Sequence, residues 1–144
     1  MRPKWYAPYG AEKVPASALL GEGFIVREPG SGTRAALDEF MGAHQLTPRV
    51  VMQMSSNESI KQAVMAGMGV ALLSLHTIGL ELDHRLIATP ECEGLPLMRR
   101  WHVVNTLAKT LSPAAEAFRY FILERGEAFL ARHFAHHRDF MPGH

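Results

Sequence analysis

The chain has 144 residues, of which 47% are hydrophobic and 20% are charged, and its formal net charge is +1. This composition is typical of a soluble protein with one hydrophobic core, and the small net charge gives no reason to expect a nucleic-acid partner. Cys92 is the only cysteine, which excludes an internal disulfide, and no apolar run approaches the roughly 18–20 residues that span a membrane. We therefore expect a cytoplasmic protein without a membrane partner.

Residues 1–20 are expected to form an irregular connector. Regular structure is interrupted there by Pro3, Pro8, Gly10 and Pro15. Residues 16–20 can still form one short turn, because they follow the last of these prolines.

A strand, a glycine-rich turn and a helix are predicted next. Residues 24–26 are rich in strand-forming side chains and are followed by a turn that contains Gly30 and Gly32. Apolar side chains then recur at helical spacing, which predicts a helix over residues 33–41 that ends at Gly42. Its buried stripe is expected to comprise Ala36, Leu37, Phe40 and Met41.

The order of strand and helix then repeats. Residues 50–54 predict a second strand, and Ser55 with Glu58 after it matches a capping box at a helix start. Gly67 and Gly69 are expected to close this helix. The wholly apolar residues 70–73 predict a short parallel strand that is covered on both faces.

The rest of the chain carries weaker strand signals and one strong helix signal. We expect a brief helix near residues 76–82 and short strands at residues 86–88 and within residues 99–105. A serine at the N-cap followed by a proline, Ser112-Pro113, predicts the start of the longest helix. The apolar face of this helix is expected to comprise Phe118, Phe121, Ile122 and Phe129.

Strands that alternate with helices predict an α/β fold, with a mostly parallel sheet flanked by helices. In open parallel sheets, ligands bind beyond the carboxyl ends of the strands. The segments that begin at Gly30 and at Ser55 each follow a strand, so two helix N-termini should meet at this edge. Backbone N–H groups and helix dipoles there favour an anion, which indicates a sensor of an acidic metabolite rather than a catalyst.

Several polar side chains at this edge have two interpretations. Ser31 or Thr33 can cap the first helix or contact a ligand, and both roles can coexist because capping leaves other N–H groups available. Gly30 and Gly32 can serve only to relieve the backbone of a tight turn. Asn57 is the best ligand candidate of the second segment, because its amide offers donors and an acceptor.

The charged side chains near the turn also have alternatives. Arg34 can contact an anion, but a surface pair with Glu28 or Asp38 is the preferred interpretation. Arg27 follows the first strand directly, and its direction stays open.

Catalytic motifs are missing from the pattern. No serine lies in a G-x-S-x-G context, and the charges of Glu91 and Glu93 are expected to raise the pKa of Cys92. The glycine-rich turn is not followed by the G-K-[ST] of a phosphate-binding loop. We therefore expect neither enzymatic activity nor a cofactor.

The eight histidines raise the question of a metal site. Three of them, His133, His136 and His137, lie close together near the C-terminus, but no cysteine or carboxylate accompanies them at a known zinc spacing. A flexible tail over residues 136–144 is the better interpretation, so no metal site is expected.

A set of motifs in this chain resembles the effector domain of LysR-type transcriptional regulators. The motifs are REPGSGTR at 27–34, SNESIKQAV at 56–64, AGMGVALLS at 66–74, GLP at 94–96, Arg100-Trp101 to Val104, Lys109 and LSPAA at 111–115. They follow the family's order over about residues 15–131. The residues of these motifs are most similar to those of regulators of the carbon-fixation (RuBisCO) operon.

The resemblance implies one lobe of a domain like the type II periplasmic binding proteins, with a metabolite between two lobes. Residues 21–111 would form the second lobe, and residues 112–135 the helix that normally returns to the first lobe. The implied effector-binding residues are Ser31, Gly32, Thr33, Asn57 and Glu58. The implied partners are a small anionic metabolite and a second copy of the chain, in a homodimer.

A full regulator of this kind also has a helix-turn-helix domain, and neither this nor most of the first lobe is expected in the chain. DNA would then be contacted only through that absent domain. The implied function is to sense a small anionic, phosphorylated metabolite and so control transcription. The alternative is a stand-alone binding or dimerisation module that modulates full-length regulators without binding a ligand.

Overall fold

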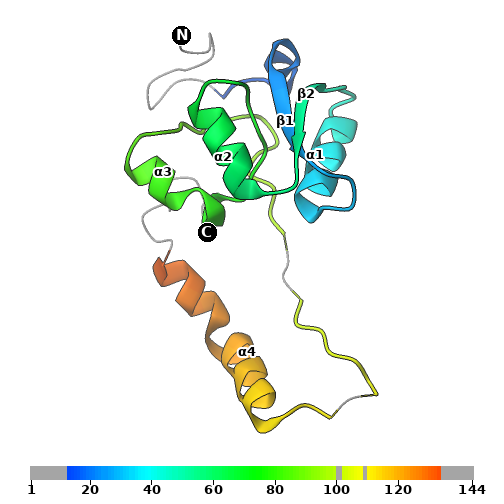
Figure 1. Cartoon of the computed structure of the whole chain (residues 1–144), viewed down its shortest axis with the longest axis vertical. Helices are drawn as coiled ribbons and strands as arrows, with labels where there is room; N and C mark the ends of the chain where they lie inside the picture. Colours follow the sequence, from blue (N-terminus) through cyan, green and yellow to red (C-terminus); the bar gives the residue numbers. More distant parts are fainter. Residues whose placement is uncertain (1–12, 100–101, 109, 134–144) are drawn as a thin grey trace. The chain divides into compact units, whose positions relative to one another are not determined.

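A computed structural model of the protein describes residues 13–99, 102–108 and 110–133 (Figure 1). The chain divides into two compact units, Met1–Leu97 and Met98–His144. The assignment of residues 21–111 to one lobe, and of residues 112–135 to a returning helix, stays a prediction.

The first unit is built around two parallel strands, β1 (Gly23–Arg27) and β2 (Arg49–Met54). Helix α1 (Gly32–Ala43) joins them, and helix α2 (Asn57–Met65) follows β2. The two helices lie on opposite sides of the strands (Figure 1). The predicted α/β fold, with parallel strands flanked by helices, is confirmed.

Alternation along β1 explains why this strand is buried on both faces. Phe24 and Val26 belong to one apolar cluster, which also contains Leu37, Phe40 and Met41 of α1. Ile25 points to the opposite face and packs in a second cluster with Ile60 and Ala63 of α2. Successive side chains of a strand point to opposite faces, so one strand holds both helices.

The predicted strand at residues 70–73 is only partly formed. Among these four residues, all of them described, Val70 alone is bridged to a strand: Ile25 N donates to Val70 O at 2.8 Å, and Val70 N donates to Gly23 O at 2.9 Å. Val70 and Leu72 still pack on one cluster, and Ala71 and Leu73 on the other.

A glycine at position 69 makes this bridge possible. A Cβ on Gly69 would collide with the backbone carbonyl oxygen of Gly23. Only a residue without a side chain lets the segment approach β1 so closely.

The segment before β1 contributes to the core. A short 3-10 helix, η1 (Ala16–Gly21), follows Pro15, so the predicted turn is confirmed. Ala16 and Leu19 are buried in the same cluster as the apolar face of α1. The described end of the predicted connector is therefore part of the folded unit.

The start of α2 differs from the prediction. The N-cap is Ser56, whose Oγ accepts a hydrogen bond from Ser59 N at 3.3 Å, so the predicted capping box of Ser55 and Glu58 is wrong. With the cap one residue later, Glu58 becomes the second residue of the helix. Its carboxylate pairs with Lys61 instead.

The end of α1 also differs. Gly42 lies inside the helix, which continues to Ala43, so Gly42 is not its terminator. The left-handed backbone that follows is taken by Gln45, with φ of 54°. Leu46 N then donates to Met41 O at 2.8 Å, which supplies a partner for one of the last carbonyls of the helix.

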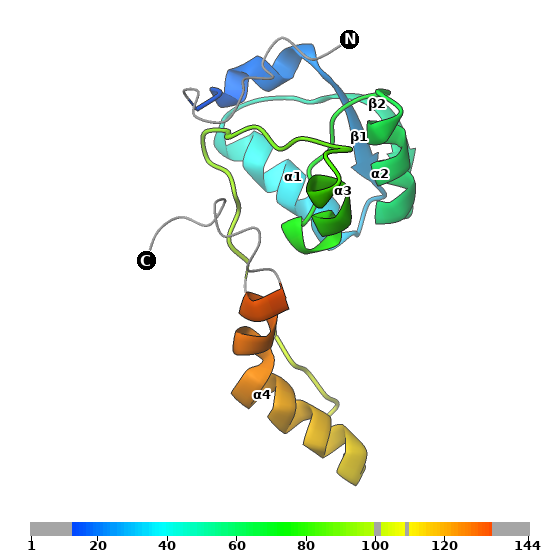
Figure 2. The same ribbon diagram turned by 90° about the vertical axis from the view of Figure 1, so that its left-hand side faces the viewer.

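Two short helices, η2 (Leu75–Thr77) and α3 (Gly79–Asp83), confirm the brief helix predicted after the apolar segment. Helix α3 lies beside α2 in both views (Figures 1 and 2). Residues 86–88, predicted as a strand, have no strand structure among the described residues.

The second unit contains α4 (Pro113–His133). Ser112 Oγ accepts a hydrogen bond from Ala115 N at 3.3 Å, so the predicted helix start is confirmed. The strand predicted within residues 99–105 is wrong for its described part, because residues 102–105 have no strand structure; Trp101 lies outside the described residues. Within the described part of the chain, no helix is both long enough and apolar enough to span a membrane.

Candidate functional site

The two segments singled out in the sequence leave the sheet at the same edge. β1 and β2 are parallel, and their last residues, Arg27 and Met54, are paired in register. The turn before α1 and the turn before α2 therefore begin next to each other. The structure thus brings together the two helix starts from which the candidate site was argued.

The first segment forms a tight turn that leads into α1. Gly30 has φ of 89°, a left-handed conformation that favours glycine. Ser31 N donates to Glu28 O at 3.2 Å, and Ser31 Oγ accepts from Thr33 N at 3.2 Å. Ser31 is thus the N-cap of α1, so the capping role weighed from the sequence is present.

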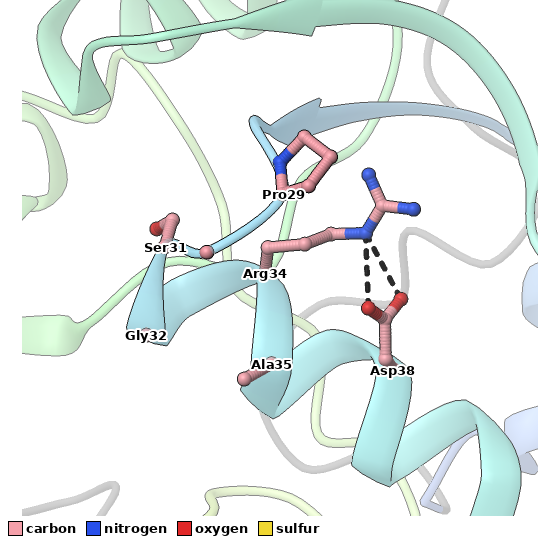
Figure 3. A pocket seen from close by; sticks show the side chains of 7 residues that line it. Pro29, Ser31, Gly32, Arg34, Ala35 and Asp38 are labelled. Carbon is pink, nitrogen blue, oxygen red and sulfur yellow. Dashed lines mark hydrogen bonds and ion pairs between the residues drawn. The ribbon is translucent and has the colours of Figure 1, made fainter.

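A shallow hollow of about 220 Å³ lies at this turn (Figure 3). Two of the predicted site residues, Ser31 and Gly32, line it; Thr33, Asn57 and Glu58 do not. Its other lining residues are Pro29, Gly30, Arg34, Ala35 and Asp38.

The charges at the hollow are balanced. Arg34 Nε lies 3.0 Å and 3.1 Å from the two carboxylate oxygens of Asp38, and Figure 3 shows the two side chains pointing toward each other. The predicted surface pairing of Arg34 is confirmed, with Asp38 as the partner. Because this ion pair is neutral as a whole, Arg34 gives the hollow no strong net positive charge.

The second segment presents Asn57 and Glu58 differently. Asn57 is half-buried, and its Oδ1 accepts a hydrogen bond from Arg27 Nη1 at 2.6 Å. Glu58 is 62% exposed; its carboxylate lies 2.7 Å from Lys61 Nζ and accepts from Gln62 Nε2 at 3.2 Å. Glu58 is thus engaged along α2, whereas Asn57 is held at the edge of the sheet.

Arg27 connects the parts of the candidate site. Its Nε lies 2.8 Å from one carboxylate oxygen of Glu28, and its Nη2 lies 2.9 Å from the other. Its backbone carbonyl accepts from Arg34 Nη1 at 3.3 Å, while its Nη1 donates to Asn57. The direction of this side chain stayed open in the sequence; the adjacent acid was a signal for one partner, and nothing local indicated the other.

The Arg27–Glu28 pair changes both proton affinities. The hydrogen bond from Arg27 is the main cause that lowers the pKa of Glu28 to about 2, from an ordinary value of 4.5. The same hydrogen bond raises the pKa of Arg27. Both groups therefore stay charged at neutral pH.

A second ion-pair cluster supports α2 from the side of α3, and sequence reasoning missed it. Lys61 Nζ lies 2.7 Å from Glu58 Oε2 and 2.8 Å from Glu81 Oε1. The side chains of Lys61 and Glu81 are only 12% and 11% exposed. This cluster holds the helix whose first residue is Asn57.

The described residues support no metal or thiol chemistry at this edge. No group of three or more His, Cys, Asp or Glu side chains among them could hold a metal ion. His136 and His137, together with the side chain of His133, lie outside the described residues. Cys92 is buried, and burial, followed by the charge of Glu93, raises its pKa, which is the predicted direction.

Comparisons with known proteins confirm the resemblance found in the motifs. The family model of the LysR substrate binding domain matches residues 5–127. The HTH-type transcriptional regulator CfxR of Cupriavidus necator is 48% identical over 125 residues, covering 87% of this chain and 38% of that protein. The HTH-type transcriptional regulator CbbR of Rhodospirillum rubrum is 50% identical over 104 residues, covering 72% of this chain and 35% of that protein.

A solved structure shows the same similarity. The Synechocystis CcmR regulatory domain in complex with 2-PG matches with a TM-score of 0.66 and 38% sequence identity. The match covers 78% of this chain and 54% of that one. The chain thus spans well under half the length of the two curated relatives described, and about half of the solved domain.

Proposed function

Because the chain belongs to the family of LysR substrate-binding domains, we propose that it senses a small anionic, phosphorylated metabolite for a transcriptional regulator. The effector would bind at the carboxyl edge of β1 and β2, against Ser31, Gly32, Thr33, Asn57 and Glu58. Binding there would change the activity of the regulator.

The observation that carries this proposal is the shared edge of the two segments. Arg27 and Met54 are paired in register, and the side chain of Arg27 bonds to Asn57 at the start of α2. Helix starts that open onto one edge supply backbone N–H donors, which suit the oxygens of an anion. The similar CcmR regulatory domain was solved in complex with 2-PG.

The names of the relatives support a wider role. Several are regulators of the RuBisCO operon, or bear HTH-type regulator names. We propose that this chain acts in the same kind of control, in the cytoplasm, with DNA contacted by a helix-turn-helix domain. The alternative is a stand-alone module that binds no ligand, and the first experiment distinguishes it from a ligand sensor.

In that first experiment, 2-PG should raise the melting temperature of the chain, whereas a sugar without phosphate should not. A ligand that binds only the folded state adds about 2.7 kcal/mol of stability at a hundred times its Kd. The Ser31→Ala/Thr33→Ala variant should bind 2-PG about tenfold more weakly in calorimetry, because the loss of hydrogen bonds to a charged group costs about 1.5 kcal/mol.

A matched control separates binding from helix capping. Ser31→Ala removes the cap of α1, which costs about 1 kcal/mol of stability by itself. Ser112→Ala removes the equivalent hydrogen bond to Ala115 N at the start of α4, in the other unit, and should leave 2-PG affinity unchanged. Equal affinity of the unaltered chain and the double variant would reject the proposed contacts.

Exposed aromatic side chains on α4 lead to a prediction about assembly. Phe118 is 64% exposed, Phe121 41% and Phe129 43%, and an apolar surface of this kind promotes association. We expect light scattering at micromolar concentration to give the mass of a dimer. Phe118→Ser should shift the distribution toward monomer; a monomer mass for the unaltered chain would contradict the prediction.

A further inference from the structure

The hydrogen bond between Arg27 and Asn57 determines which way round the Asn57 amide lies. A guanidinium group carries only donors, so the atom that faces Arg27 Nη1 at 2.6 Å must be the amide oxygen. The NH₂ group then occupies the other arm of the planar amide. The orientation of this amide follows from the chemistry of its partner rather than from a choice between similar atoms.

We propose that Arg27 is a specificity-determining positioning residue, which locks Asn57 so that it offers N–H donors to an effector. The inference rests on the proposed function, because it concerns the same edge of the sheet. It predicts that the edge selects ligands with anionic oxygens, carboxylate or phosphate, which accept hydrogen bonds. Groups that only donate would find no acceptor at Asn57.

The surroundings of Arg27 explain why it acts through Asn57 and not by its own charge. Both oxygens of Glu28 lie within 2.9 Å of guanidinium nitrogens of Arg27, so the charge of the guanidinium is balanced locally. A bidentate pair of this kind also restrains the planar group. The remaining Nη1 is thereby aimed at Asn57.

The same residue ties the Asn57 amide to the hollow at the first turn. The backbone oxygen of Arg27 accepts from Arg34, which lines that hollow, while the side chain of Arg27 reaches α2. The guanidinium group of Arg34 and the amide of Asn57 are therefore both bonded to one residue at the end of β1. A ligand that contacts both would find them preorganised.

The decisive variant is Asn57→Asp, measured with 2-PG and with inorganic phosphate as probes. A carboxylate still accepts the hydrogen bond from Arg27, and an acid at the first residue of a helix is favourable. The melting temperature should therefore stay unchanged. The donor arm, however, becomes an anionic acceptor. The affinity for each anion should fall at least about tenfold.

A matched control has the same change of charge at another place. Gln45→Glu also converts a side-chain amide to a carboxylate, here an exposed one in the turn that follows the opposite end of α1. This variant should keep the affinity within about twofold, because the turn lies away from the carboxyl edge of the strands. A similar loss in both variants would overturn the inference, since it would indicate a general charge effect.

A double-mutant cycle tests whether Arg27 acts through Asn57. Arg27→Lys should weaken binding severalfold, because one ammonium cannot hold both Glu28 and Asn57 in the geometry of the fork. Combined with Asn57→Ala, it should add little to the loss caused by Asn57→Ala alone. Additive losses would overturn the positioning role.

The outcomes separate this inference from the proposed function. If the unaltered chain binds 2-PG and Ser31→Ala/Thr33→Ala weakens binding, but Asn57→Asp does not, the inference is overturned and the proposed function stands. If the unaltered chain binds neither probe, both are overturned. Weaker binding by Asn57→Asp at an unchanged melting temperature supports the inference.

Discussion

Ile25→Ala should lower the free energy of unfolding of the first unit by about 3 kcal/mol. Ile25 is 1% exposed and lies in the middle of β1, where it packs with Ile60 and Ala63. Alanine would leave a cavity between the strands and α2, because close-packed neighbours relax only partially. Urea unfolding, monitored by circular dichroism, measures the change.

Two further variants make this result specific to the core. Ile25→Val removes one methylene group and should cost only about 1 kcal/mol. Leu80→Ala removes as many carbon atoms as Ile25→Ala, but from a side chain that is 72% exposed, and should cost less than about 0.5 kcal/mol. If Ile25→Ala were no more harmful than Leu80→Ala, the assignment of β1 as the centre of the unit would be wrong.

Lys61→Met should destabilise the first unit by about 2–3 kcal/mol at neutral pH. The Glu81 carboxylate is largely buried and loses its cationic partner in this variant, while its Oε2 has no hydrogen-bond partner among the described residues. An uncompensated buried charge costs more than the pair contributes. Guanidinium unfolding of both proteins measures the difference, and the variant Lys61→Met/Glu81→Leu should recover much of the loss.

The pH dependence of this effect has a definite sign. The hydrogen bond from Lys61 is the main cause that lowers the pKa of Glu81 below 4.5 in the folded chain. The stability that the Lys61–Glu81 pair adds to the folded chain is therefore present above about pH 4.5 and is lost as the pH falls through the folded pKa of Glu81. In Lys61→Met the pKa of Glu81 should instead be raised. The difference in free energy of unfolding between the unaltered chain and this variant should therefore become smaller as the pH falls from about 7 to 4. A gap that widens on acidification would contradict the role assigned to Glu81.

The elements of the fold that the sequence predicted are those with local signals. The strand at β1, the helix after its glycine-rich turn and the start of α4 at Ser112 depend on residues within one turn of each other. Their caps and apolar spacing are readable without knowing any distant contact. The wrong predictions at Gly42 and Ser55 concern helix ends, where neighbouring residues compete for the same role.

At the candidate site, too, some features could be predicted from the sequence and others could not. The convergence of two helix starts followed from parallel pairing, because parallel strands end at the same edge. The roles of the side chains at that edge could not be predicted from this pairing. Glu58, a residue predicted to bind the effector, pairs with Lys61, and the direction of Arg27 became known only with Asn57 in place.

The sequence alone determined the order β1, α1, β2 and α2, the parallel class of the sheet and the family to which the chain belongs. These depend on periodicity, caps and motifs that act over a few residues. Only the tertiary structure decided the contacts of Arg27 with Asn57 and of Lys61 with Glu81, which join residues 30 and 20 positions apart. Such pairs form because packing brings separate elements together, and no pattern along the chain encodes which side chains then meet.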